Sequence, residues 1–264
     1  MSTATLPQTD RPGYALTTPR ILRAEWHKLW SLRSTWITVL SACAIVLAVG
    51  ITMGSTYDGD DADVDTVLFV LYGSTLSQII LAVLGILVTA GEYATGMIRS
   101  SVAAVPRRLP VLWAKTTVFG AAVLTITLAT NAVTFLTAQI WLGDTDKAAS
   151  LTDANILAPL VGNAVGTTLL ALTALGLGAL LRSVPGAIGA LIGGIVILPE
   201  VLSTLPWDGM KDIVTYFPTQ AASALGTHTP MGDEASTAGA LIALVVWAGG
   251  VLALAAVFLK RRDV

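Results

Sequence analysis

Six long apolar runs, almost free of charged residues, constrain the fold of this chain more than any other feature of its sequence. A helix needs about 20 apolar residues to cross a hydrocarbon core of about 30 Å. Glu200 is the one formally charged residue within the six runs. The runs that we expect to span a membrane are residues 36–54, 67–90, 117–142, 156–181, 184–205 and 237–259.

The composition supports a membrane protein over a soluble one. Hydrophobic residues make up 54% of the chain and charged residues 12%, whereas soluble domains carry about a quarter charged residues. The apolar runs are continuous and lack the alternation that the wall of a β-barrel requires. Helices remain as the way to satisfy every backbone group inside a bilayer. The sequence therefore predicts an all-α, polytopic membrane protein with six transmembrane helices.

The lysines and arginines predict the orientation of the chain in the membrane. Thirteen of the fifteen fall on one side of the expected spans, and only Lys147 and Lys211 fall on the other. The positive-inside rule assigns the first side to the cytoplasm. We therefore expect both termini to be cytoplasmic, with a flexible cytoplasmic tail at 1–19, a cytoplasmic loop at 91–116 and an outer loop at 206–236.

Residues 20–35 are expected to form an amphipathic helix that precedes the first span. Leu22, Trp26, Leu29, Trp30 and Trp36 share one broad face, and basic or polar residues occupy the other. Tryptophans at headgroup level and basic residues toward anionic lipid are typical of a helix lying in the membrane interface. A plain anchor beside the first span is the alternative interpretation. The residues singled out in this helix are Glu25, Trp26, Lys28, Trp30 and Arg33, of which Arg33 lies on the apolar side and would snorkel.

The cytoplasmic loop contains the stretch "GEYATGMIRSSVAAVPRRLPVLWAK". Ile98, Val102 and Val105 recur at helical spacing and predict a short helix with one apolar face. We expect Pro106 to end this helix and Pro110 to break the chain again before the third span. An ordinary positive-inside loop would need the basic residues but no apolar ridge. Together with residues 20–35, the loop favours a docking surface for a soluble partner.

Two stretches carry a resemblance to a known family. The stretch "EWHKLWSLRSTW" resembles the elbow helix and first-span entry in the membrane subunit, or permease, of bacterial type-2 ABC exporters, whose ATPase is a separate chain. "YFPTQAASAL" is similar to that family's outer segment before its last span. Ala94 and Met97 depart from the family, which more often has a polar residue and a threonine there. The pattern after the second span is similar in Glu92, Gly96, Arg99, Pro106, Arg107, Arg108 and Lys115.

The resemblance implies a transporter. The chain would move an amphipathic or hydrophobic substrate across the bacterial cytoplasmic membrane, using two copies of a separate ATPase and a second permease chain, with a homodimer preferred to a heterodimer. The second and fifth spans, with Ser77, Gln78 and Glu200, would line the cavity. Contact with the ATPase would fall to Glu92, Gly96, Ile98, Arg99, Val102, Val105, Pro106 and Arg107.

Several motifs are absent from the sequence. There is no G-x-x-x-x-G-K-[ST] phosphate loop, so ATP and Mg²⁺ are expected in the partner ATPase and no enzyme activity in this chain. We expect no catalytic, cofactor or metal residues and no nucleic-acid partner. A membrane scaffold that docks a cytosolic protein is the alternative function. An ion-coupled carrier would need interrupted helices in repeated halves with ionisable residues at mid-membrane, and no such repeat is found.

Polar and small residues inside the spans predict contacts between helices. The third span has Asn131 and four threonines at helical spacing, which favours helix–helix contacts over a pore lining. Gly162-x-x-x-Gly166 and Gly189-x-x-x-Gly193 predict close helix packing. For Glu200 two interpretations stay open, namely a carboxylate that faces a cavity and a boundary residue that pairs or snorkels.

Overall fold

The computed structural model describes residues 17–59, 65–97, 108–207, 209–227 and 235–261. Within these ranges every regular element is a helix, and six helical segments are long and apolar enough to cross a membrane. The predicted fold class, an all-α polytopic membrane protein with six spans, is therefore confirmed. The six segments are α2 (Arg33–Ser55), α4 (Ser74–Ala94), α6 (Arg108–Leu142), α7 (Ala154–Leu181), the consecutive helices of Val184–Ser203, and α12 (Thr237–Arg261).

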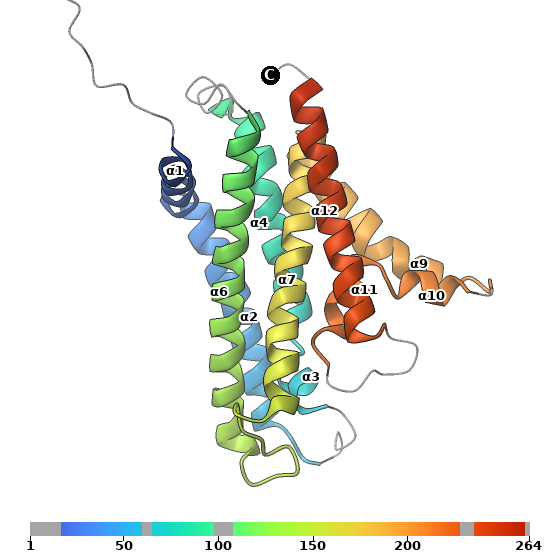
Figure 1. Ribbon diagram of the computed structural model, residues 1–264. Helices are drawn as coiled ribbons and strands as arrows, with labels where there is room; N and C mark the ends of the chain where they lie inside the picture. The colour runs from blue at the N-terminus through green and yellow to red at the C-terminus, as the bar shows by residue number, and fades with distance from the viewer. Residues whose placement is uncertain (1–16, 60–64, 98–107, 208, 228–234, 262–264) are drawn as a thin grey trace, which may run out of the picture.

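The bundle is built around the pair α4 and α7. In Figure 1 these two helices lie in the middle, with α2 and α6 on one side and α12 on the other. Thr89 of α4 donates a hydrogen bond to the Leu175 carbonyl of α7 (2.9 Å). A Cβ added to Gly85 would stand 2.6 Å from the carbonyl oxygen of Ala171, so the two backbones touch there. Small residues at the contact allow this close approach.

The second expected span, 67–90, is divided in the structure. A short helix, α3 (Thr66–Val70), precedes α4 and is capped by the Asp65 carboxylate, which accepts hydrogen bonds from the amides of Val67 and Leu68. The connecting turn ends at Gly73, where an added Cβ would lie 2.8 Å from Val49. The turn is therefore pressed against α2, and the span itself begins only at Ser74.

The expectation that Pro110 breaks the chain before the third span is wrong. Helix α6 begins at Arg108 and continues through Pro110 for 35 residues. Proline is tolerated in the first turn of a helix because its missing N–H would have had no intrahelical partner there. The third span therefore starts well before the expected residue 117 and reaches into the loop region.

The fifth span is irregular. It consists of α8 (Val184–Gly189), the π-helix η1 (Ala190–Ile197) and α9 (Leu198–Ser203), and in Figure 1 it leans away from the bundle together with α10 (Met210–Val214). Pro199 cannot donate to the carbonyl of Ile195, four residues earlier. That carbonyl instead accepts a hydrogen bond from the Thr219 hydroxyl of α11 (Pro218–Ala224) at 3.0 Å. The Thr219 hydroxyl of α11 thus supplies a donor to the carbonyl that Pro199 cannot serve.

The first of the two glycine pairs packs as predicted, and the second does not. A Cβ added at Gly162 would collide with the carbonyl oxygen of Leu225, and one at Gly166 would lie 2.9 Å from that of Ala222. At these two glycines the backbone of α7 therefore packs directly against the backbone of α11 and of Leu225, the residue after α11. Cβ atoms added at Gly189 and Gly193 would meet nothing within 4 Å among the described residues, so this pair supports no close contact within the protomer.

We expect Gly162→Ala to lower the free energy of unfolding by about 1–3 kcal/mol, because the clash is with backbone that cannot rotate away. Gly189→Ala is the matched control, and it is expected to be neutral or to stabilise by up to about 1 kcal/mol through helix propensity. Reversible unfolding by sodium dodecyl sulfate in mixed micelles measures both values. Equal stability of the two variants would contradict the close contact between α7 and the Leu225 carbonyl.

Candidate functional site

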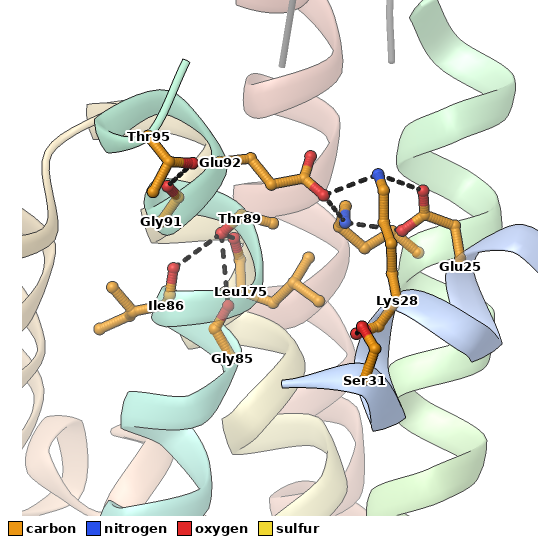
Figure 2. A network of polar contacts seen from close by, with 11 residues as sticks. Glu25, Lys28, Ser31, Gly85, Ile86, Thr89, Gly91, Glu92, Thr95 and Leu175 are labelled. Carbon is orange, nitrogen blue, oxygen red and sulfur yellow. Dashed lines mark hydrogen bonds and ion pairs between the residues drawn. The ribbon is translucent and has the colours of Figure 1, made fainter. Parts of the chain in front are cut away.

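Four charged side chains from three helices meet at one end of the bundle. They are Glu25 and Lys28 of α1 (Thr18–Ser31), Glu92 of α4 and Lys115 of α6. The Nζ of Lys28 lies 3.0 Å from Oε1 of Glu25 and 2.8 Å from Oε1 of Glu92. The Nζ of Lys115 lies 2.6 Å from Oε2 of Glu25 and 2.9 Å from Oε1 of Glu92. We call these four residues the ion network, and Figure 2 shows Glu92 reaching from α4 toward the charged groups of α1.

The positions of the helix ends bring these residues together. Glu25 and Lys28 lie three residues apart, on neighbouring turns of one face of α1. Glu92 lies in the last turn of α4, and Lys115 lies about two turns into α6. Leu29 fixes α1 against this end of the bundle, because it is buried in the same apolar cluster as Leu84 and Phe119. Helix α1 is thereby attached to the spans by apolar packing and by charge.

The ion network is buried and charge-balanced. The residues Glu25, Glu92 and Lys115 are only 6%, 8% and 6% exposed, while the Lys28 side chain keeps 30% of its surface accessible. Two carboxylates face two ammonium groups, so no net charge is left in the low-dielectric interior. The second oxygen of Glu92, Oε2, is buried and accepts no hydrogen bond from the residues that the structure describes. A hydrogen-bond acceptor therefore remains open inside the network.

The surroundings of Lys28 favour its charged form. Burial alone would lower the pKa of Lys28. The hydrogen bond to Glu92 and the charges of Glu25 and Glu92 outweigh burial, so the pKa of Lys28 is raised above its ordinary value. The lysine thus stays protonated through the neutral pH range.

The structure unites part of the residue set proposed from the sequence. Glu25 and Lys28, singled out on the amphipathic helix, contact residues from the predicted cytoplasmic loop. Lys28 pairs with Glu92, which was expected to contact the ATPase, and Lys115 pairs with both Glu25 and Glu92. Gly96 follows α4 with a φ of +73°, a left-handed conformation that glycine adopts without strain. The other coupling residues lie outside the described residues: Ile98, Arg99, Val102, Val105, Pro106 and Arg107.

The elbow helix differs in detail from the expectation for 20–35. Helix α1 ends at Ser31, Leu32 is extended, and Arg33 is already the first residue of α2, where it is exposed. The rings of Trp26 and Trp30 lie 5.6 Å apart, and Trp26 is 45% exposed in the protomer. The two buried residues of the helix are Leu29, which the sequence pattern placed on the apolar face, and Glu25, which it did not.

The structure places the three residues expected to line a substrate cavity in two different surroundings. Ser77 and Gln78 are buried inside the bundle, and Ser77 borders a space of about 10 Å³ between α2, α4, α6 and α7. Glu200 lies exposed on α9 and accepts a hydrogen bond from the Gln220 amide of α11 at 2.7 Å. Glu200 therefore contacts another helix, and no cavity found among the described residues contains all three.

A second polar cluster links α4, α6 and α7 inside the bundle. Asn131 of α6 donates to the Leu160 carbonyl and to the Asn163 side chain, both of α7, at 3.1 Å. Asn163 donates in turn to the hydroxyl of Ser74 at the start of α4 (3.0 Å). Side-chain amides between helices serve as packing contacts in membrane proteins. The prediction of helix–helix contacts for the polar face of the third span therefore agrees with the structure at Asn131.

The described residues offer no metal site, since no three His, Cys, Asp or Glu side chains among them could hold one ion. Comparison of the chain with models of known protein families and with curated protein sequences finds no match. The functional argument therefore rests on the residues and on their arrangement.

Proposed function

We propose that this chain is the membrane subunit of an ATP-driven exporter, which moves an amphipathic or hydrophobic substrate with energy from a separate ATPase. The observation that supports this proposal most is the ion network. Its members lie on the amphipathic helix before the first span and on both sides of the segment predicted to dock the ATPase. A movement of that segment would be transmitted to α1, α4 and α6 through these buried ion pairs.

The arrangement suits a mechanical coupling. Glu92 and Lys115, which flank the predicted docking segment, contact each other directly at 2.9 Å, so the two ends of that segment are joined. Both also reach α1, Glu92 through Lys28 and Lys115 through Glu25. When ATP closes a pair of ATPases, the docked segment would move α4 and α6 together with α1. In a dimer of permeases this movement would open a path between the two subunits.

A photoreactive amino acid at Met97 tests the proposal in intact cells. Met97 is 39% exposed, and it lies at the start of the predicted docking segment. We expect illumination to cross-link the full chain to an ATPase that carries a phosphate loop, as identified by mass spectrometry. The control is the same amino acid at Trp207, an exposed residue next to the short helix α10 at the far end of the fifth span, which is expected to give no such adduct.

A membrane scaffold is the second candidate, because the same end of the bundle would also suit a cytosolic partner that does not hydrolyse ATP. The cross-linking experiment separates the two functions. An adduct at Met97 with a protein that lacks a phosphate loop, and with no ATPase, would favour the scaffold and count against export.

A further inference from the structure

The turn that joins the fourth and fifth spans contains the one non-glycine residue with a positive φ among the described residues. It is Arg182, with a φ of +54°, and its amide donates a hydrogen bond to the Gly178 carbonyl at the end of α7. Helices that end in this left-handed conformation usually have glycine there, because a Cβ crowds the following carbonyl oxygen. The turn has only two residues, Arg182 and Ser183, before α8 begins. An arginine here therefore carries a conformational cost that its side chain has to offset.

The side chain of Arg182 contacts Tyr93 at the end of α4. Its guanidinium lies over the tyrosine ring, with 5.1 Å between Cζ and the ring centroid. A guanidinium within about 6 Å of the face of an aromatic ring is attracted by the electrons of that face. Tyr93 belongs to the last turn of α4 and directly follows Glu92 of the ion network. The end of α4 is thus held twice, by the ion network through Glu92 and by Arg182 through Tyr93.

A narrow stripe of buried residues attaches the fifth span to the bundle. This span is the least buried of the six segments described above. Ala187, Leu191 and Ile195 pack in one apolar cluster with residues of α4 and α7. On the rest of the span, Cβ atoms added at Gly189 and Gly193 would meet nothing within 4 Å among the described residues. Packing along a single stripe allows a helix to rock, so the turn at the beginning of the span has a strong influence on its tilt.

We propose that Arg182 is a positioning residue, which joins the fifth span to the end of α4 by stacking on Tyr93. A movement of the end of α4 would then tilt the fifth span as well. The part of this role that concerns transport rests on the proposed function, in which a docked ATPase moves α4. The contact itself requires neither an ATPase nor a substrate. It can therefore be tested on the purified chain, and its failure would leave the proposed function standing.

The distance between two spin labels reports the position of the fifth span. The labels are attached to cysteines at Gly189, where an added side chain meets open space, and at Trp113, an exposed residue near the start of α6. Cys43, the one native cysteine, is replaced by alanine. The labelled full chain is diluted with unlabelled chain in phosphatidylcholine nanodiscs, so that only distances within one chain are measured. Double electron–electron resonance then gives the distribution of the distance.

Arg182→Asn is the main variant, because asparagine tolerates the left-handed backbone and removes the guanidinium. We expect one narrow distribution for the parent and a distribution about twofold wider for this variant, since the attraction to the Tyr93 ring is lost. Arg23→Asn is the matched control. It makes the same substitution at an exposed arginine of α1, and its distribution should equal that of the parent.

Variants of Tyr93 test the same contact from the side of α4. Tyr93→Leu removes the ring and should widen the distribution as much as Arg182→Asn does, whereas Tyr93→Phe keeps the aromatic face and should retain the parent width. The double variant Arg182→Asn/Tyr93→Leu should be no wider than either single variant, because both substitutions remove one shared contact.

A parent-like distribution in Arg182→Asn or in Tyr93→Leu would overturn the proposal. A double variant much wider than both single variants would overturn it as well, since the two residues would then act independently. If Arg182→Asn does not yield folded protein, the comparison of Tyr93→Leu with Tyr93→Phe decides the question, because those variants leave the turn itself unchanged.

Discussion

Replacing Lys115 by methionine is expected to lower the free energy of unfolding by about 3–5 kcal/mol, the cost of removing one partner from a buried ion pair. The Nζ of Lys115 holds Oε2 of Glu25 and Oε1 of Glu92 at the same time. Without it, two buried carboxylates share a single lysine. Methionine keeps most of the apolar stem, so the loss reports the charge more than the packing. Unfolding by sodium dodecyl sulfate in mixed micelles measures the change.

A matched control and a rescue separate charge balance from other effects. Lys211→Met makes the same substitution at an exposed residue of α10 and is expected to change stability by less than about 0.5 kcal/mol. The double variant Glu25→Met/Lys115→Met leaves Lys28 and Glu92 as a balanced pair, and it should recover much of the loss. If the single Lys115→Met variant is as stable as Lys211→Met, the ion network does not hold α1 to the spans.

The sequence predicts the spans well because their signal is local. Each span shows itself in about 20 consecutive apolar residues, and no knowledge of distant residues is needed to find it. One exception has a local cause, and the other depends in part on a contact between helices. Pro110 was expected to break the chain, yet a proline in the first turn of α6 costs no hydrogen bond. The division of 67–90 depends on the Asp65 cap and on the contact of Gly73 with α2.

The candidate site could be predicted only in part, since its contacts join residues far apart in the chain. The sequence points to Glu25 and Lys28 through the amphipathic helix, and to Glu92 and Lys115 through the pattern that follows the second span. Nothing local in the sequence pairs Lys115 with Glu25, which lies 90 residues earlier. The signal that could have linked them is the rarity of charge next to apolar spans. Two acids and two bases at one membrane boundary must compensate one another.

The same reasoning applies to the residues expected to line a cavity. Ser77, Gln78 and Glu200 were grouped because the family resemblance makes the second and fifth spans lining elements. In the structure the fifth span leans away from the bundle, and Glu200 pairs with Gln220 of α11. Polar residues in a span report the need for a partner, while the identity of that partner depends on how the helices pack.

Under the proposed function, Val102→Asp is expected to abolish co-purification of the proposed ATPase with the full chain and to abolish substrate-stimulated ATP hydrolysis. Val102 lies outside the described residues, and the prediction rests on its helical spacing with Ile98 and Val105 in the sequence. A short apolar ridge that fills a groove of a soluble partner concentrates binding energy in a few central side chains. A carboxylate at the centre of that ridge would be buried without a partner, which costs far more than the lost methyl contacts.

Ser100→Asp is the matched control for this variant, because it adds the same charge two residues away. On a helix of 3.6 residues per turn, Ser100 falls on the face opposite the ridge. It should keep the ATPase bound, and both variants should insert into the membrane equally, since neither changes a span. Arg107→Lys retains the positive charge that sets topology and should also be tolerated if that residue serves orientation alone. A Val102→Asp chain that still binds an ATPase and exports a substrate normally would leave the segment between α4 and α6 with a role in topology alone, and the ion network would then serve stability alone.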